Sequence, residues 1–227
     1  MKRFLLVFSC MFVLLQGHAQ IQPKSYFATT DLGLDAQKDG RGNSFNVYRI
    51  SASLNRMVKD KWAVGAFLTY GKGISEIEKS NENISPDMFF YDYYKQEISS
   101  WNIGSQTRYY FPVKQRLYVF GEGRIGIMHE SADSEYFATS YVKSNPENTT
   151  SKFGGSEQFS SLSINGILAP GITYLVYDRI GLEMKLNLLQ YSHIIDSSSA
   201  PEGTEYLHKF STVSGFSSVR VGASFYF

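Results

Sequence analysis

The last stretch of the chain, residues 216–227, alternates with a period of two between apolar residues and polar or small ones. Successive side chains of a β-strand point to opposite faces, so one face of this stretch would be apolar. That face would carry Val219, Val221, Ala223, Phe225 and Phe227. A strand with lipid on one side and a polar lumen on the other needs this pattern. The stretch therefore predicts a membrane-spanning strand.

Seven further segments show the same alternation. They are residues 26–34, 44–57, 62–71, 98–111, 117–128, 161–174 and 180–190. The connections after the second, fourth and sixth segments are short, whereas residues 72–96, 129–158 and 191–210 form long polar stretches. An even number of strands, with short turns on one rim and long loops on the other, is typical of outer-membrane barrels. The sequence predicts an all-β fold, an antiparallel up-and-down transmembrane barrel of eight strands with short periplasmic turns and long extracellular loops.

The beginning of the chain has the pattern of a secretory signal peptide. Basic Lys2 and Arg3 precede an apolar run at residues 4–15, and Gly17 and Ala19 are small. The run is shorter than the roughly 20 residues of a spanning helix. We expect a cleaved signal peptide at residues 1–19 and one barrel domain at residues 20–227. The only cysteine, Cys10, lies in the expected signal peptide, so a disulfide scaffold is not expected.

Charged residues of the strands fall on the face that is predicted to line the lumen. They are Arg108, Glu122, Arg124, Glu183, Lys185 and Arg220. Neighbouring strands would bring Arg108 near Glu122 and Arg124, and Glu183 and Lys185 near Arg220. An eight-stranded barrel is only wide enough for its own side chains, and buried charges must be paired. The pattern predicts a lumen plugged by paired charges. A polar path for small solutes is the alternative.

The alternation alone also permits a soluble barrel, in which the apolar residues would point inward and the polar residues outward. The signal peptide, the terminal phenylalanine and the three long connections on one rim favour the membrane barrel. Aromatic residues near the short turns are expected to form an interfacial girdle. They are Trp62, Tyr109, Phe111, Tyr174, Tyr177, Phe225 and Phe227.

A second aromatic group lies in the first long polar stretch, at residues 88–94. Its rings are Phe89, Phe90, Tyr91, Tyr93 and Tyr94. Such a group on a long loop could contact a partner or the outer-leaflet surface. It could equally extend the strands above the membrane, and the sequence leaves both possibilities open.

Residues 108–123 and 170–183 resemble strand-turn-strand segments of the small outer-membrane β-barrel family of Gram-negative bacteria, the OmpA/OmpX-like, porin-family barrel domain. Terminal Phe227 is similar to the signal that the barrel-assembly machinery recognises in that family. The resemblance implies a monomer in the outer membrane, assembled with periplasmic chaperones and surrounded by lipid and lipopolysaccharide. It implies no single activity, because the family includes structural anchors, adhesion or defence proteins and small-solute channels.

Sequence patterns for catalysis are weak. Ser192 and His193 precede Asp196, but the His-x-Ser-Asn pattern of lipid A deacylases is missing. The four histidines have no paired spacing for a metal, and a formal net charge of +1 gives no basic field for nucleic acid. We expect no catalytic residue, metal or cofactor. The predicted role is structural or surface interaction, with a passive small-solute channel second and a lipid-modifying enzyme third.

Overall fold

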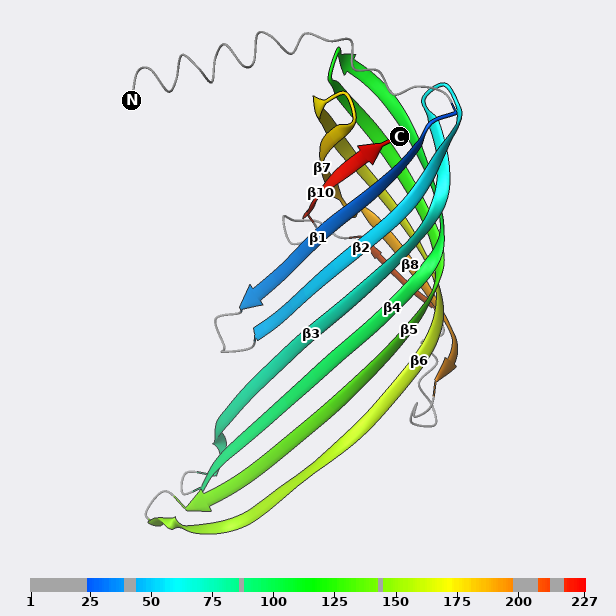
Figure 1. Cartoon of the computed structure of the whole chain (residues 1–227). Coiled ribbons are helices and arrows are strands. Elements are labelled where there is room, and N and C mark those ends of the chain that lie inside the picture. The colour runs from blue at the N-terminus through cyan, green and yellow to red at the C-terminus, as the bar shows by residue number, and fades with distance from the viewer. Residues whose placement is uncertain (1–23, 39–43, 86–87, 143–144, 198–207, 213–218) are drawn as a thin grey trace, which may run out of the picture.

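The computed structural model describes residues 24–38, 44–85, 88–142, 145–197, 208–212 and 219–227. Within these ranges the chain is built from antiparallel strands (Figure 1). They are β1 (Tyr26–Lys38), β2 (Ser44–Lys59), β3 (Trp62–Ser85), β4 (Met88–Lys114), β5 (Leu117–Val142), β6 (Asn145–Tyr177), β7 (Ile180–Leu186), β8 (Leu189–Ser197), β9 (His208–Thr212) and β10 (Val219–Tyr226). No helix in the described part of the chain is long and apolar enough to span a membrane. The expected signal peptide lies outside the described residues.

The strands close into a ring of eight. Each of β1 to β6 pairs with the next strand in the chain, and β10 pairs with both β7 and β1. The closing seam runs from Phe27 opposite Tyr226 to Gly33 opposite Arg220. β7 and β8 are two parts of one wall strand, because both pair with β6 and only two residues separate them. The predicted eight-stranded antiparallel barrel is confirmed.

The predicted faces of the strands are also confirmed. On β10, Val221 is 59% exposed and Phe225 is 48% exposed, whereas Arg220 and Ser224 are buried. Outward residues of the other strands are likewise large and apolar, with Ile103 62% exposed on β4. The barrel is thus apolar outside and polar inside, which suits lipid and is the reverse of a soluble barrel.

Two aromatic belts bound the apolar outer wall. The lower belt, beside the short turns, contains the predicted residues Trp62, Tyr109, Phe111, Tyr174, Tyr177, Phe225 and Phe227. The upper belt, which the sequence did not reveal, contains Tyr48, Tyr70, Trp101 and Tyr191. Phe111 and Trp101 lie ten residues apart on β4. At about 3.3 Å per residue and a tilt of about 40°, the belts lie roughly 25 Å apart, the height of a lipid-facing band.

Two of the expected long loops are strands. The described residues of 72–96 and 129–158 continue the ladders of β3, β4, β5 and β6 well beyond the upper belt. Glu76 pairs with Lys95, and Glu135 pairs with Ser156. The result is a four-stranded sheet that projects from one side of the barrel (Figure 1). We call it the projecting sheet. Both of its faces lie beyond the apolar band, so no apolar alternation marked these strands in the sequence. In the third long stretch, the described residues are also strands, because 191–197 belong to β8 and 208–210 begin β9, which pairs with β8. Residues 198–207 lie outside the described part.

Candidate functional site

Seven charged side chains are buried inside the barrel, among the residues that the structure describes. They are Asp31, Arg108, Glu122, Arg124, Glu183, Lys185 and Arg220. Each occupies an inward position of a spanning strand, where the period of two points its side chain into the lumen. Six of them are the residues singled out from the sequence. The seventh, Asp31, was not among them.

Arg108 lies at the centre of this charge network and is 1% exposed. Its Nη2 donates to Glu122 Oε2 at 2.5 Å, and its Nη1 donates to Glu183 Oε1 and Oε2 at 2.8 and 2.9 Å. Glu122 is the direct register partner of Arg108 on β5, whereas Glu183 reaches it from β7 across the lumen. A planar guanidinium with five donors can serve both carboxylates at once.

Asp31 holds the remaining cations together. Its Oδ2 lies 2.8 Å from Lys185 Nζ and 3.6 Å from Arg124 Nη2, and its Oδ1 accepts from Arg220 Nη1 at 3.3 Å. Lys185 also donates to Glu122 Oε1 at 3.1 Å, which joins the two halves of the network. Lys185 and Arg220 are register partners, as the sequence suggested. The counter-charge of Arg220, however, is Asp31.

An apolar layer fills the lumen between the charge network and the short turns. It consists of Phe27, Met57, Ala63, Tyr110, Tyr118, Phe120, Leu175 and Tyr226. Most of these residues are the first or last inward positions of their strands, so they converge at one end of the barrel. The Arg108 guanidinium lies 4.2 Å from the ring centre of Phe120 and donates to the Tyr110 hydroxyl at 3.0 Å. A cation over an aromatic face is attracted to it, which binds the charge network to this apolar plug.

Hydroxyl and amide side chains of β2 and β4 pack beside the charges in the lumen. Gln106 Nε2 donates to Asn55 Oδ1 at 2.6 Å and to Ser53 Oγ at 3.0 Å. Arg124 Nη1 donates to Ser51 Oγ at 3.1 Å and so connects this layer to the charges. The inside of the barrel therefore contains the apolar plug, the charges and the polar side chains that contact them.

The geometry of the lumen favours a closed barrel. Each of the seven charges lies within 3.3 Å of an opposite charge. An unpaired ion of this kind would cost several kcal/mol to bury. The apolar plug, buried throughout, lies between these charges and the short turns. The network can thus stabilise the barrel.

Phe227, the predicted assembly signal, lies at the closing seam. Its N–H donates to the Tyr26 carbonyl at 2.8 Å, and its carbonyl accepts from the Tyr26 N–H at 2.9 Å. The two rings stack with centroids 6.2 Å apart, and Phe227 is 57% exposed on the outer wall. The residue therefore belongs to the lower belt. Its recognition by an assembly factor stays a prediction.

The aromatic group at residues 88–94 begins β4, so the backbone adopts the strand extension that the sequence left open. Tyr93 and Tyr94 are half-buried, and the Tyr94 hydroxyl donates to Ser134 Oγ on β5 at 3.1 Å. The side chains of Phe89, Phe90 and Tyr91 lie outside the described part. Surface contact by this group stays a prediction.

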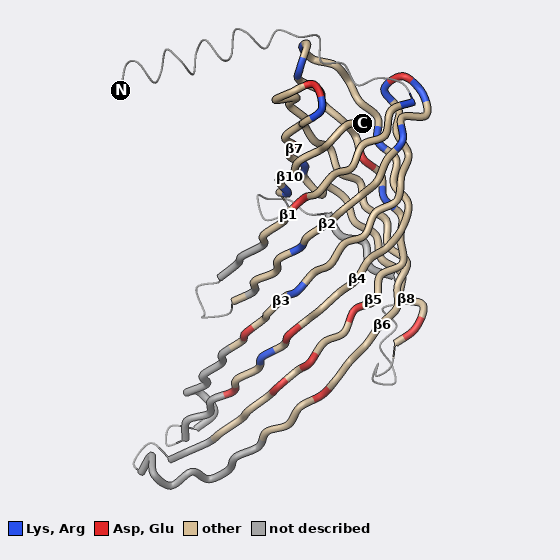
Figure 2. The backbone as a smooth tube through the Cα atoms, viewed as in Figure 1, with Lys and Arg blue, Asp and Glu red and all other residues tan. Residues whose placement is uncertain are grey.

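The projecting sheet carries exposed charges (Figure 2). Lys95 Nζ lies 2.8 Å from Glu97 Oε1, and Lys72 Nζ lies 3.8 Å from Glu97 Oε2. The hydrogen bond and charge of Lys95, with a smaller contribution from Lys72, hold the pKa of the Glu97 carboxyl below its ordinary value. Acidic residues outnumber basic ones among the described residues of this sheet. The described residues contain no group of three His, Cys, Asp or Glu placed to hold a metal.

No protein-family model matches the sequence, and no curated protein matches it. Solved structures do. The chain is similar to Ail, the attachment invasion locus protein of Yersinia pestis, at 10% identity, with 91% of this chain and all of that chain covered and a TM-score of 0.38. It is similar to Neisserial surface protein A at 14% identity, with 89% and 97% covered and a TM-score of 0.40. The N-terminal β-barrel of Pseudomonas aeruginosa OprF is 13% identical, with 91% and 100% covered and a TM-score of 0.36.

Proposed function

We propose that this chain is a monomeric outer-membrane barrel with a closed lumen, which presents the projecting sheet at the cell surface for contact with other molecules. A signal peptide cleaved after Ala19 would export it, and the barrel-assembly machinery would insert it with Phe227 as the signal. The short turns would face the periplasm, and lipopolysaccharide would surround the other rim.

The observation that carries this proposal is the pair of free edges on the projecting sheet. Beyond Glu76, β3 pairs only with β4 in the described part, and the described residues of β6 from Asn145 to Glu157 pair only with β5. An unpaired edge presents backbone donors and acceptors that an extended segment of another chain can continue. A barrel that served only as an anchor would need no such sheet.

A register-matched truncation tests the surface role. Glu76 and Lys95 face each other across β3 and β4, as do Glu135 and Ser156 across β5 and β6. Two-residue turns at these pairs would remove the outer part of the sheet and leave the barrel strands intact. Cells with the full and the trimmed barrel would be compared for binding of labelled extracellular proteins, with the heat-dependent gel shift as the control for folding. Equal binding by both would refute the surface role.

Conductance in planar bilayers tests the closed lumen separately. We expect no single-channel steps from the wild type. Replacement of Tyr110 and Tyr226 by alanine would open the apolar plug, and we expect steps to appear in that variant. Steps from the wild type would instead favour the passive channel.

A further inference from the structure

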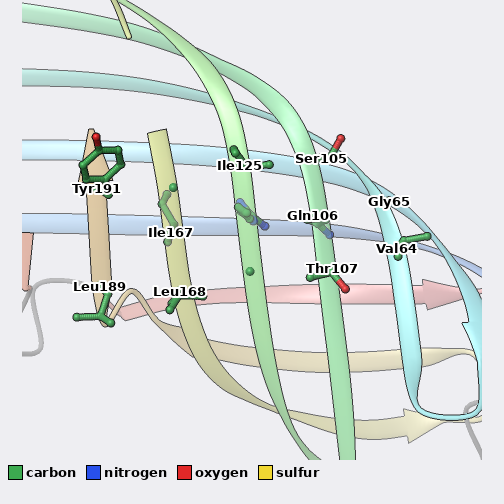
Figure 3. A pocket seen from close by; sticks show the side chains of 13 residues that line it. Val64, Gly65, Ser105, Gln106, Thr107, Ile125, Ile167, Leu168, Leu189 and Tyr191 are labelled. Atoms are coloured by element: carbon green, nitrogen blue, oxygen red, sulfur yellow. The ribbon is translucent and has the colours of Figure 1, made fainter. Parts of the chain in front are cut away.

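The outer wall of the barrel has a hollow with a volume of about 780 Å³. It crosses β3, β4, β5, β6 and β8 (Figure 3). One row of register partners runs along it: Val64, Thr107, Gly123, Leu168 and Leu189. Four spacings between strands, at about 4.8 Å each, make it roughly 19 Å long. We call this hollow the wall groove.

Glycines make the wall groove deep. A Cβ added at outward-facing Gly123 would meet its nearest atoms at 3.5 and 3.6 Å, and one at Gly166 would meet its nearest atom at 3.9 Å, both ordinary contacts. Inward-facing Gly126 differs, because a Cβ there would lie 2.6 Å from Asn102 Oδ1. The packing of this chain therefore needs glycine inside the barrel but not at the groove. Glycine weakens a strand, so the open space on the wall indicates an occupant from outside the chain.

The groove lies between the aromatic belts, where its surroundings are apolar. Its walls include the exposed aliphatic residues Ile125 and Leu168. The Thr107 hydroxyl is already engaged, since it accepts from Trp62 Nε1 at 2.6 Å and donates to the Ala63 carbonyl at 3.2 Å. Half of a hydrocarbon core is about 15 Å thick, so a groove of this length suits one acyl chain.

Trp62, which donates to groove residue Thr107, lies beside a basic rim. Lys59 is the register partner of Trp62, and its Nζ lies 6.0 Å from the Trp62 ring centre. Lys61 completes the same turn, and both lysines are exposed. Further exposed cations stand on the short-turn side of the barrel, against two acidic residues (Figure 2). The cations are Lys24, Arg56, Lys114 and Arg179, and the acidic residues are Asp60 and Asp178. Basic clusters at a membrane surface attract anionic headgroups.

We propose that the wall groove holds one acyl chain of an anionic phospholipid from the leaflet beside the short turns, with the lipid phosphate at Lys59 and Lys61. Apolar shape selects the chain, and the basic rim selects the headgroup. The site requires only the spanning barrel, so it stands independently of the surface role proposed above.

Tryptophan quenching by brominated lipid tests this site. The chain has two tryptophans, so Trp101→Phe leaves Trp62, in contact with groove residue Thr107, as the only one. Phosphatidylglycerol brominated on its acyl chains would be titrated into the folded, detergent-solubilised full chain. We expect quenching that saturates near one lipid per barrel, with half-saturation at a roughly tenfold lower concentration than for brominated phosphatidylcholine.

Variants separate the two parts of the site. Gly123→Leu and Gly166→Leu fill the groove and should each raise the half-saturation concentration roughly tenfold, while Lys59→Gln with Lys61→Gln should abolish the preference for phosphatidylglycerol. Ala223→Leu is the matched control, because Ala223 is an exposed outward residue of β10 on the opposite wall, and it should change neither. The heat-dependent gel shift shows which variants fold. If only one of the two glycine variants folds, that variant is enough to test the groove.

Three results would overturn the proposal. One is quenching that follows the lipid fraction of the micelle without saturation. Another is saturable quenching that both filled variants retain. The third is a stable dimer in detergent whose contact covers the groove and protects Trp62, since a second copy would then be the occupant.

Discussion

Glu122→Ala is the most informative single substitution inside the barrel. Glu122 accepts from Arg108 Nε and Nη2 and from Lys185 Nζ, and its Oε1 lies 2.8 Å from Arg124 Nε. Its removal leaves four buried cations with two carboxylates, Asp31 and Glu183. Breaking a buried pair in this way costs about 3–5 kcal/mol. Because a folded domain is stable by only about 5–15 kcal/mol, the loss should be large.

Urea unfolding in lipid vesicles, followed by the fluorescence of the two tryptophans, would measure this loss. The double variant Glu122→Ala with Lys185→Met is the control for lost volume. It restores the wild-type excess of one buried cation and leaves Asp31 with Arg124 and Arg220. We expect it to recover part of the stability. If Glu122→Ala unfolds at the wild-type midpoint, water solvates these charges, and the account of a sealed lumen fails.

Three further perturbations test other parts of the structure. Val221→Lys places a charge on the lipid-facing wall and should lower the free energy of unfolding by about 2–4 kcal/mol near mid-depth, which reduces the folding yield in vesicles. Asp133→Lys on the projecting sheet should leave that folding yield unchanged. Similar losses from both variants would refute the placement of the membrane. In carboxyl NMR, Glu97 should titrate below its ordinary pKa of 4.5. Its contribution to stability is therefore present above that pKa and is lost as the pH falls through the lowered value. Lys95→Gln should return the pKa of Glu97 to its ordinary range. Deletion of Phe227 should reduce insertion in cells more than the unfolding midpoint of the purified barrel, and the opposite order would contradict its role as an assembly signal.

The membrane-spanning part of the fold was predictable because lipid imposes a period of two on each strand. Residues such as Val221 and Arg220 differ in hydropathy since one faces lipid and the other faces the lumen. Strand number, strand order and the inner or outer face of each side chain follow from that pattern and from the spacing of the turns. The lower aromatic belt follows from the same spacing, because it lies beside the short turns.

The projecting sheet was not predictable from the same pattern. Its strands have no lipid on either face, so residues such as Glu97 and Ser134 can be polar on both sides. Only the ladder with neighbouring strands shows that they continue beyond the upper belt. The aromatic group at residues 88–94 illustrates this, since loop and strand were equally consistent with its sequence.

Closure of the ring determines which charged residues pair inside the barrel and which residues become neighbours on its outer wall. The period-two alternation along each strand is enough to put Arg108, Glu183 and Asp31 on the inner face. It does not show that Glu183 reaches Arg108 across the lumen or that Asp31 collects the remaining cations. The wall groove likewise depends on which residues of five strands become register neighbours. Periodicity along a strand determines the face of each residue, whereas contacts between distant strands depend on register and barrel diameter, which only the closed structure specifies.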